Sequence, residues 1–107
     1  MINYDSRRFR ALDAEDESAI AQYHQNGDLL WGEFAGGSVR RGSLCGRCLP
    51  DGELEFAYTT VLMSGEIIAG HCRSTPEVLA DGRIRLSEKW ERFGSHAAVG
   101  VSEIEEV

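Results

Sequence analysis

The sequence predicts an all-β fold, a single antiparallel meander of about eight strands. Two observations predict it. Glycine-containing turn dipeptides punctuate the chain at short intervals, and the residues between them alternate between apolar and polar side chains with the period of two that strands have. A length of 107 residues fits one domain, 1–107, and 42% hydrophobic residues is ordinary for a folded protein.

Glycine marks six of the expected turns. Asn-Gly and Asp-Gly supply the positive φ that tight hairpin turns require. The turns are Asn26-Gly27, Gly36-Gly37, Pro50-Asp51-Gly52, Ser64-Gly65, Asp81-Gly82 and Gly94-Ser95, and the acidic stretch Asp13 to Glu17 is expected as a further connection. The strands expected between them are 2–12, 18–26, 28–36, 38–49, 53–63, 66–75, 83–93 and 97–105. A helix over 13–25 is the alternative for one segment, but the hairpin turn that follows favours a strand there.

Alternation is clearest over residues 83–91. Ile84, Leu86, Glu88 and Trp90 fall on one face of such a strand, and the other face is polar. A helix would mix these faces. Residues 53–62 alternate in the same way.

Eight antiparallel strands joined by hairpins can close into a barrel, which leaves no exposed sheet edge. We therefore expect a closed β-barrel of lipocalin- or avidin-like build, which either fills with side chains or holds one small ligand. Glycines within the expected strands fit places where a strand coils sharply or leaves interior space: Gly32, Gly42, Gly46, Gly70 and Gly100. An open curved sheet that completes itself by dimerising is the alternative.

Charge and composition limit the partners. Asp and Glu number 18 against 11 Lys and Arg, a net charge of −7, which argues against nucleic acid as a partner. No apolar run is long enough for a membrane-spanning helix, and no signal peptide is visible at the start. Three cysteines leave at least one unpaired, which suits the cytoplasm.

Cys45-Gly46-Arg47-Cys48 matches the C-x-x-C pattern of redox and zinc sites. On a strand, however, residues three apart point to opposite faces, so the two thiols are expected to diverge. A zinc site would need further ligands, and His71 with Cys72 offers only a loose supply. We therefore expect small buried or half-buried cysteines, no metal and no cofactor. His24 and His96, each beside a turn, are expected to be exposed loop residues.

Glu88 is the most informative residue, because a carboxyl group on an apolar face must be paired, hydrogen-bonded or shifted in pKa. It could pair with Arg73 or Arg10, or accept a hydrogen bond from Tyr58. It could instead anchor a ligand, with Trp90 and Tyr58 as walls of the cavity. Arg73 or Arg85 could then hold an anionic group at the barrel mouth. The candidate ligand-binding residues are Glu88, Trp90, Tyr58, Arg73 and Cys72.

Three functions follow from this interpretation. The first is binding of a small molecule inside the barrel, and the second is a non-catalytic interaction module that forms a homodimer. The third is an enzyme whose chemistry would centre on Glu88, His71 and Cys72, although no residue can be assigned as catalytic. No nucleophile elbow, P-loop or dinucleotide-binding motif is present in the sequence.

The run from Gly70 to Trp90, with Tyr23-His24-Gln25-Asn26-Gly27 and Gly36-Gly37-Ser38 upstream, resembles a family of small bacterial proteins of about this length. The resemblance covers nearly the whole chain. Members of that family often carry the name N-acetylglutamate synthase, which implies acetyl transfer from acetyl-CoA to glutamate. The glycine-rich turn that opens a helix in the usual acetyltransferase fold has no counterpart around Arg40-Arg41-Gly42.

Overall fold

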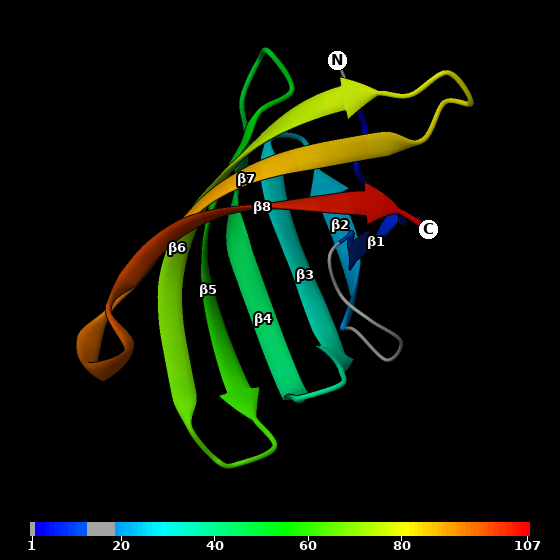
Figure 1. Ribbon diagram of the computed structural model, residues 1–107. Coiled ribbons are helices and arrows are strands. Elements are labelled where there is room, and N and C mark those ends of the chain that lie inside the picture. The colour runs from blue at the N-terminus through cyan, green and yellow to red at the C-terminus, as the bar shows by residue number, and fades with distance from the viewer. Residues whose placement is uncertain (1, 13–18) are drawn as a thin grey trace.

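The computed structural model describes residues 2–12 and 19–107, and these form a closed antiparallel barrel (Figure 1). Each strand pairs with the next along the chain, and pairing of the first with the last closes the barrel. The elements are β1 (Arg8–Ala11), β2 (Ile20–Asn26), β3 (Leu29–Gly36), β4 (Val39–Cys48), β5 (Leu54–Leu62), β6 (Ile67–Val78), β7 (Ile84–Arg92), the short 3-10 helix η1 (Gly94–His96) and β8 (Ala98–Glu106).

The predicted all-β meander of eight strands is confirmed, and because the sheet closes, the open-sheet alternative is wrong. The six predicted turns all contain a glycine with positive φ: Gly27, Gly37, Gly52, Gly65, Gly82 and Gly94. β2 confirms the strand expected before the first of these turns, so the helix considered over 13–25 is wrong for the described residues 20–25. Residues 13–18, the first part of that segment, lie outside the described residues.

Most strand boundaries fall within two residues of the prediction, and two strands, β1 and β6, differ by more. Residues 2–7 are not a strand, because they cross the end of the barrel instead of continuing along its wall. The backbone N–H of Tyr4 donates to the side chain of Gln25, and Ser6 has a φ of 64°. β6 runs past Pro76 to Val78 because it keeps pairing with β7 over these residues. Its pairing with β5 ends at Ser74, so the other edge of β6 is open there and tolerates a residue without an N–H.

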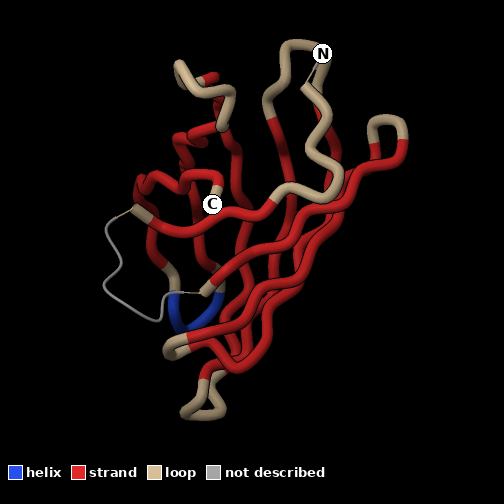
Figure 2. Tube along the Cα trace, turned by 90° about the vertical axis from the view of Figure 1, so that its right-hand side faces the viewer, coloured by secondary structure: helices blue, strands red, loops and turns tan. Residues whose placement is uncertain are grey.

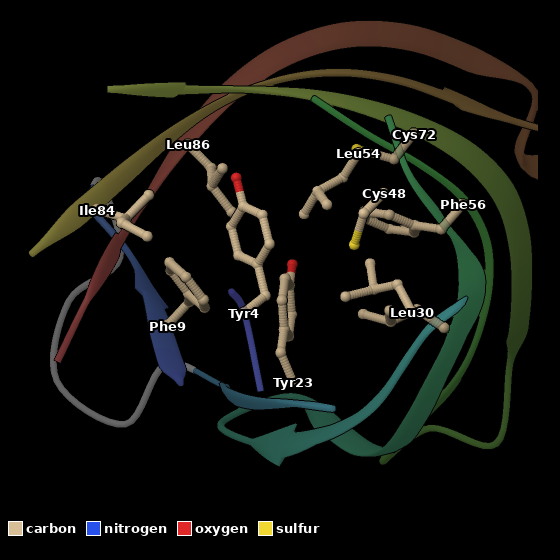
Figure 3. Close-up of a cluster of buried hydrophobic side chains, with 11 residues drawn as sticks. Tyr4, Phe9, Tyr23, Leu30, Cys48, Leu54, Phe56, Cys72, Ile84 and Leu86 are labelled. Carbon is tan, nitrogen blue, oxygen red and sulfur yellow. The ribbon is translucent and has the colours of Figure 1, made fainter. Parts of the chain in front are cut away.

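The N-terminal segment closes one end of the barrel. Tyr4 is fully buried, and its hydroxyl donates to the carbonyl oxygen of Gly52 in the β4–β5 turn at 2.7 Å. Figure 3 shows the rings of Tyr4, Phe9 and Tyr23 pointing into the interior. The core at this end also contains Leu30, Cys48, Leu54, Ile84 and Leu86. Figure 2 shows η1 at the end of the barrel opposite the N-terminal segment.

Every mid-strand glycine highlighted by the sequence lies directly opposite an inward-facing aromatic residue on a neighbouring strand. The pairs are Tyr23 with Gly32, Phe34 with Gly42, Phe56 with Gly46, Tyr58 with Gly70 and Trp90 with Gly100. A Cβ atom built on Gly42 would lie 2.1 Å from the Phe34 ring, and one on Gly100 would lie 2.2 Å from the Trp90 ring. The rings of Phe34, Tyr58 and Trp90 therefore lie across Gly42, Gly70 and Gly100, in space that a side chain at those positions would occupy.

Candidate ligand-binding site

The interior of the barrel holds a cavity of about 380 Å³, toward the end opposite Tyr4. This volume falls within the range of sites that hold small molecules. Apolar and aromatic side chains form most of the wall, and the polar groups among them are few. The wall includes Ala21, Phe34, Val39, Leu44, Phe56, Tyr58, Thr60, Leu62, Ile68, Cys72, Glu88, Trp90, Arg92, Ser102 and Ile104.

Glu88 faces this cavity from the middle of β7. Ser74 on β6 and Ser102 on β8 lie directly opposite it on the two neighbouring strands. The Ser74 hydroxyl donates to Glu88 Oε2 at 3.1 Å, and the Cys72 thiol donates to the same oxygen at 3.5 Å. The predicted alternative partners of Glu88 are wrong, because Arg73, Arg10 and Tyr58 make neither a salt bridge nor a hydrogen bond with it in the described part of the chain.

Burial raises the pKa of Glu88, while hydrogen bonds from Cys72, Ser74 and Ser102 oppose part of the rise. The carboxyl group therefore has hydrogen-bond donors but no cation to neutralise it, within the part of the chain that the structure describes. Burial, followed by the nearby carboxyl group, raises the pKa of the Cys72 thiol, so this cysteine is a hydrogen-bonding group and a poor nucleophile.

Trp90 on β7 and Tyr58 on β5 both line the cavity, two strands apart in the barrel. Contact of these two rings with a ligand stays a prediction. Each ring crosses a glycine on a neighbouring strand, Gly100 and Gly70 respectively. Burial raises the pKa of Tyr58, and hydrogen bonding with Arg92 opposes this rise. The phenol is therefore neutral near pH 7 and keeps a proton that it can donate.

Arg73 and Arg85 lie outside the cavity. Arg73 follows the inward-facing Cys72 by one residue, so its side chain projects from the outer face and pairs with Glu53 at 2.9 Å. Arg85 pairs with Glu105 at 2.8 Å. The basic residue that does line the cavity is Arg92, which the sequence reasoning missed. Alternation along β7 could have identified it, since Arg92 lies two residues beyond Trp90 and four beyond Glu88, on the same face of the strand.

The residues of the enzyme hypothesis do not meet in one site. His71 lies on the exposed face of β6, next to Glu55, whereas Cys72 and Glu88 face the interior. Cys45 is exposed and Cys48 is buried, as the divergence of the C-x-x-C thiols predicted. Among residues 2–12 and 19–107, no three His, Cys, Asp or Glu side chains are arranged to hold a metal ion.

Two histidine predictions need correction. His24 lies within β2, where its ring stacks on Trp31 and its Nε2 is 2.8 Å from a Glu33 oxygen. His96 lies in η1, and its Nε2 is 3.1 Å from a carboxylate oxygen of Glu66. Neither side chain is a freely exposed loop residue.

The sequence from residue 2 to residue 107 matches the family described as avidin-like protein. The chain belongs to the avidin-like family. Comparison with curated proteins and with solved structures gave no match. The avidin-like match agrees with the closed eight-stranded barrel, and it does not bear on the acetyl transfer implied by the resemblance to N-acetylglutamate synthases, which stays a prediction. No described helix of this avidin-like chain is long and apolar enough to cross a membrane.

Proposed function

We propose that this avidin-like barrel binds a small molecule in its interior. The observation that carries the proposal is the Glu88 carboxyl group, which is held inside an apolar cavity with no basic partner among the described residues. The ligand would place a hydrogen-bond donor at Glu88 and an apolar body against the aromatic wall.

The free-energy cost of burying Glu88 supports this interpretation. Glu88 is half-buried, and its burial is enough to raise the pKa of the carboxyl group. A polar group moved out of water without a hydrogen bond costs roughly 2–7 kcal/mol, and the hydrogen bonds that Glu88 accepts offset part of this cost. Cys72 and Ser74 satisfy one oxygen, Oε2, from the side of β6. An apolar residue of similar size would stabilise a filled interior better, so a carboxyl group at this position is understandable if it contacts a ligand.

The aromatic–glycine pairs support the same function. Trp90 and Tyr58 lie along the wall because Gly100 and Gly70 leave room for their rings. Rings held flat in this way offer their faces to a ligand and leave the centre of the barrel open. We therefore expect a ligand with a flat apolar body.

Fluorescence titration with N-phenyl-1-naphthylamine, a neutral aromatic amine with one N–H donor, tests the proposal. The probe should bind one molecule per chain and brighten as it leaves water. Val39→Trp, which fills the cavity at the start of β4, should abolish the change. Glu88→Gln should stay folded and bind about tenfold more weakly, the loss expected for one hydrogen bond to a charged group.

Absence of binding to the native protein, or equal binding to Val39→Trp, would contradict the proposal. Circular dichroism shows whether Glu88→Gln is folded. If it is not, Glu88 is needed for the fold, and Trp90→Leu takes its place as the variant that must weaken binding.

Acetyl transfer is a second candidate, supported only by the resemblance over Gly70 to Trp90. Incubation of the pure protein with acetyl-CoA and glutamate tests it. Formation of N-acetylglutamate would establish the activity, and absence of product would remove this candidate.

A further inference from the structure

Arg92 differs from the other basic residues of the described chain because its side chain lines the cavity. Arg7, Arg47, Arg73, Arg83 and Arg85 all pair with carboxylates on the outer surface. Arg92 is the one basic side chain that lines the cavity, and no carboxylate in the described part of the chain lies within 4 Å of it. Arg8, Arg10, Arg40, Arg41 and Lys89 also have no carboxylate within 4 Å among the described residues, but they do not line the cavity. The charge of Arg92 is therefore available to a ligand.

The neighbouring strands hold Arg92 at the cavity mouth. It is the last residue of β7, two positions beyond Trp90, and its guanidinium carbon lies 5.0 Å from the centre of the Trp90 ring. Across β6, Gly70 lies directly between Arg92 and Tyr58. A Cβ atom on Gly70 would come within 2.5 Å of the Tyr58 hydroxyl oxygen, so the missing side chain lets this hydroxyl approach the guanidinium.

We infer that Arg92 and Tyr58 form a mouth site that selects a ligand carrying an organic anion, a carboxylate or a sulfonate. This inference rests on the proposed function and adds the chemical class of the ligand. The Arg92 guanidinium has several N–H donors and no competing carboxylate, and the Tyr58 O–H can donate to the same anion. The Trp90 ring fixes the guanidinium in place through a cation–π contact.

The separation along β7 places Glu88 and Arg92 at different depths of the cavity. Glu88 and Arg92 are four residues apart on one strand, about 13 Å at the usual rise of a strand. The cavity thus offers an acceptor in its middle and a cation at its mouth. An elongated amphiphile fits, with an N–H or O–H donor at one end and an acidic group at the other.

A matched pair of probes tests the charge preference. 8-Anilinonaphthalene-1-sulfonate is the N-phenyl-1-naphthylamine skeleton with one added sulfonate. The sulfonate lies beside the N–H, so the pair tests the preference of the mouth site for an anion and not the length of the ligand. We expect the native protein to bind the sulfonate more tightly than the neutral amine. Arg92→Gln should weaken sulfonate binding about tenfold, as for a charge-assisted hydrogen bond at a partly exposed site, and change amine binding less than twofold. Tyr58→Phe should weaken sulfonate binding by about threefold.

Arg73→Gln is the control, since it removes one arginine from the outer face and should leave both affinities unchanged. Equal effects of Arg92→Gln on both probes, or equal loss of sulfonate binding in Arg73→Gln, would overturn the inference while leaving interior binding intact. Failure of the native protein to bind the neutral amine would contradict the proposed function itself, so the two failures are distinguishable. Sulfonate binding that survives Val39→Trp occurs outside the cavity and would also overturn the inference.

Discussion

Replacement of Gly100 by alanine tests whether the aromatic–glycine pairs create the interior space. The added Cβ would lie 2.2 Å from Cζ2 of Trp90 and 2.7 Å from Cε2 and Cη2. Ordinary contact begins near 3.4 Å, so the ring has to move by about 1.2 Å. Overpacking of this kind costs about 1–3 kcal/mol, and the loss of glycine's freedom in the unfolded chain offsets roughly 0.4–1 kcal/mol of it. We expect Gly100→Ala to lower the free energy of unfolding by about 1–2 kcal/mol.

Urea unfolding followed by circular dichroism measures this change, and a double-mutant cycle assigns it to the ring. In a Trp90→Leu background, Gly100→Ala should be neutral or slightly stabilising, so the coupling between the two sites should be at least about 1 kcal/mol. Trp90 fluorescence, measured in a Trp31→Phe background, should shift because the displaced ring enters the cavity. Binding of N-phenyl-1-naphthylamine should weaken for the same reason.

Two results would refute this reasoning. One is a Gly100→Ala protein as stable as the native chain with unchanged Trp90 fluorescence. The other is an equal destabilisation in the presence and absence of the Trp90 ring, which would assign the cost to the strand backbone.

Further predictions concern buried polar groups. Tyr4→Phe removes a buried hydrogen bond to the β4–β5 turn and should lower the free energy of unfolding by about 1–2 kcal/mol in urea titrations; no change would show that this bond does not hold the N-terminal segment in place. Burial raises the pKa of Glu88 above its ordinary value of 4.5, so ionisation destabilises the folded state as pH rises through and above that value. Relative to the native protein, Glu88→Gln should therefore gain stability in urea titrations between pH 4 and pH 8, and a constant difference would contradict the raised pKa. Iodoacetamide near pH 8 should modify Cys45 rapidly, and Cys48 and Cys72 only after unfolding, because burial shields both and raises the pKa of both thiols. Mass spectrometry counts the modified thiols, and rapid modification of all three would contradict the burial.

Local chemistry explains why so much of the barrel could be predicted from the sequence. A tight turn needs glycine at positive φ, and a half-buried strand alternates its side chains, so both features are visible without tertiary information. The closed end could not be predicted in this way. Tyr4 is held by contacts with Gly52 and Gln25, far along the chain, and nothing in residues 2–7 indicates that they leave the barrel wall.

The part of the candidate site that could be predicted is the choice of inward-facing residues, because side chains alternate between the two faces of a strand. Alternation along a strand places Glu88 and Trp90 on the inner face. The same rule places Arg92 on the inner face and Arg73 on the outer face, but the sequence-based prediction did not extend the rule to these two residues. The hydrogen-bond partners of Glu88 could not be predicted from this alternation, because they depend on how neighbouring strands pair. Ser74 and Ser102 lie beside it only because the β6–β7 and β7–β8 registers bring them opposite, and register depends on the exact lengths of two connections.

Native mass spectrometry tests the central claim, an interior that holds a small molecule, most directly. Freshly purified protein, alone and after incubation with N-phenyl-1-naphthylamine, is compared with Val39→Trp. We predict a noncovalent complex of one small molecule per chain that dissociates on denaturation and is lost in the variant. The same spectrum reports whether the chains form the homodimer that the sequence leaves open. A bare chain under both conditions, or a complex that Val39→Trp retains, would contradict the account.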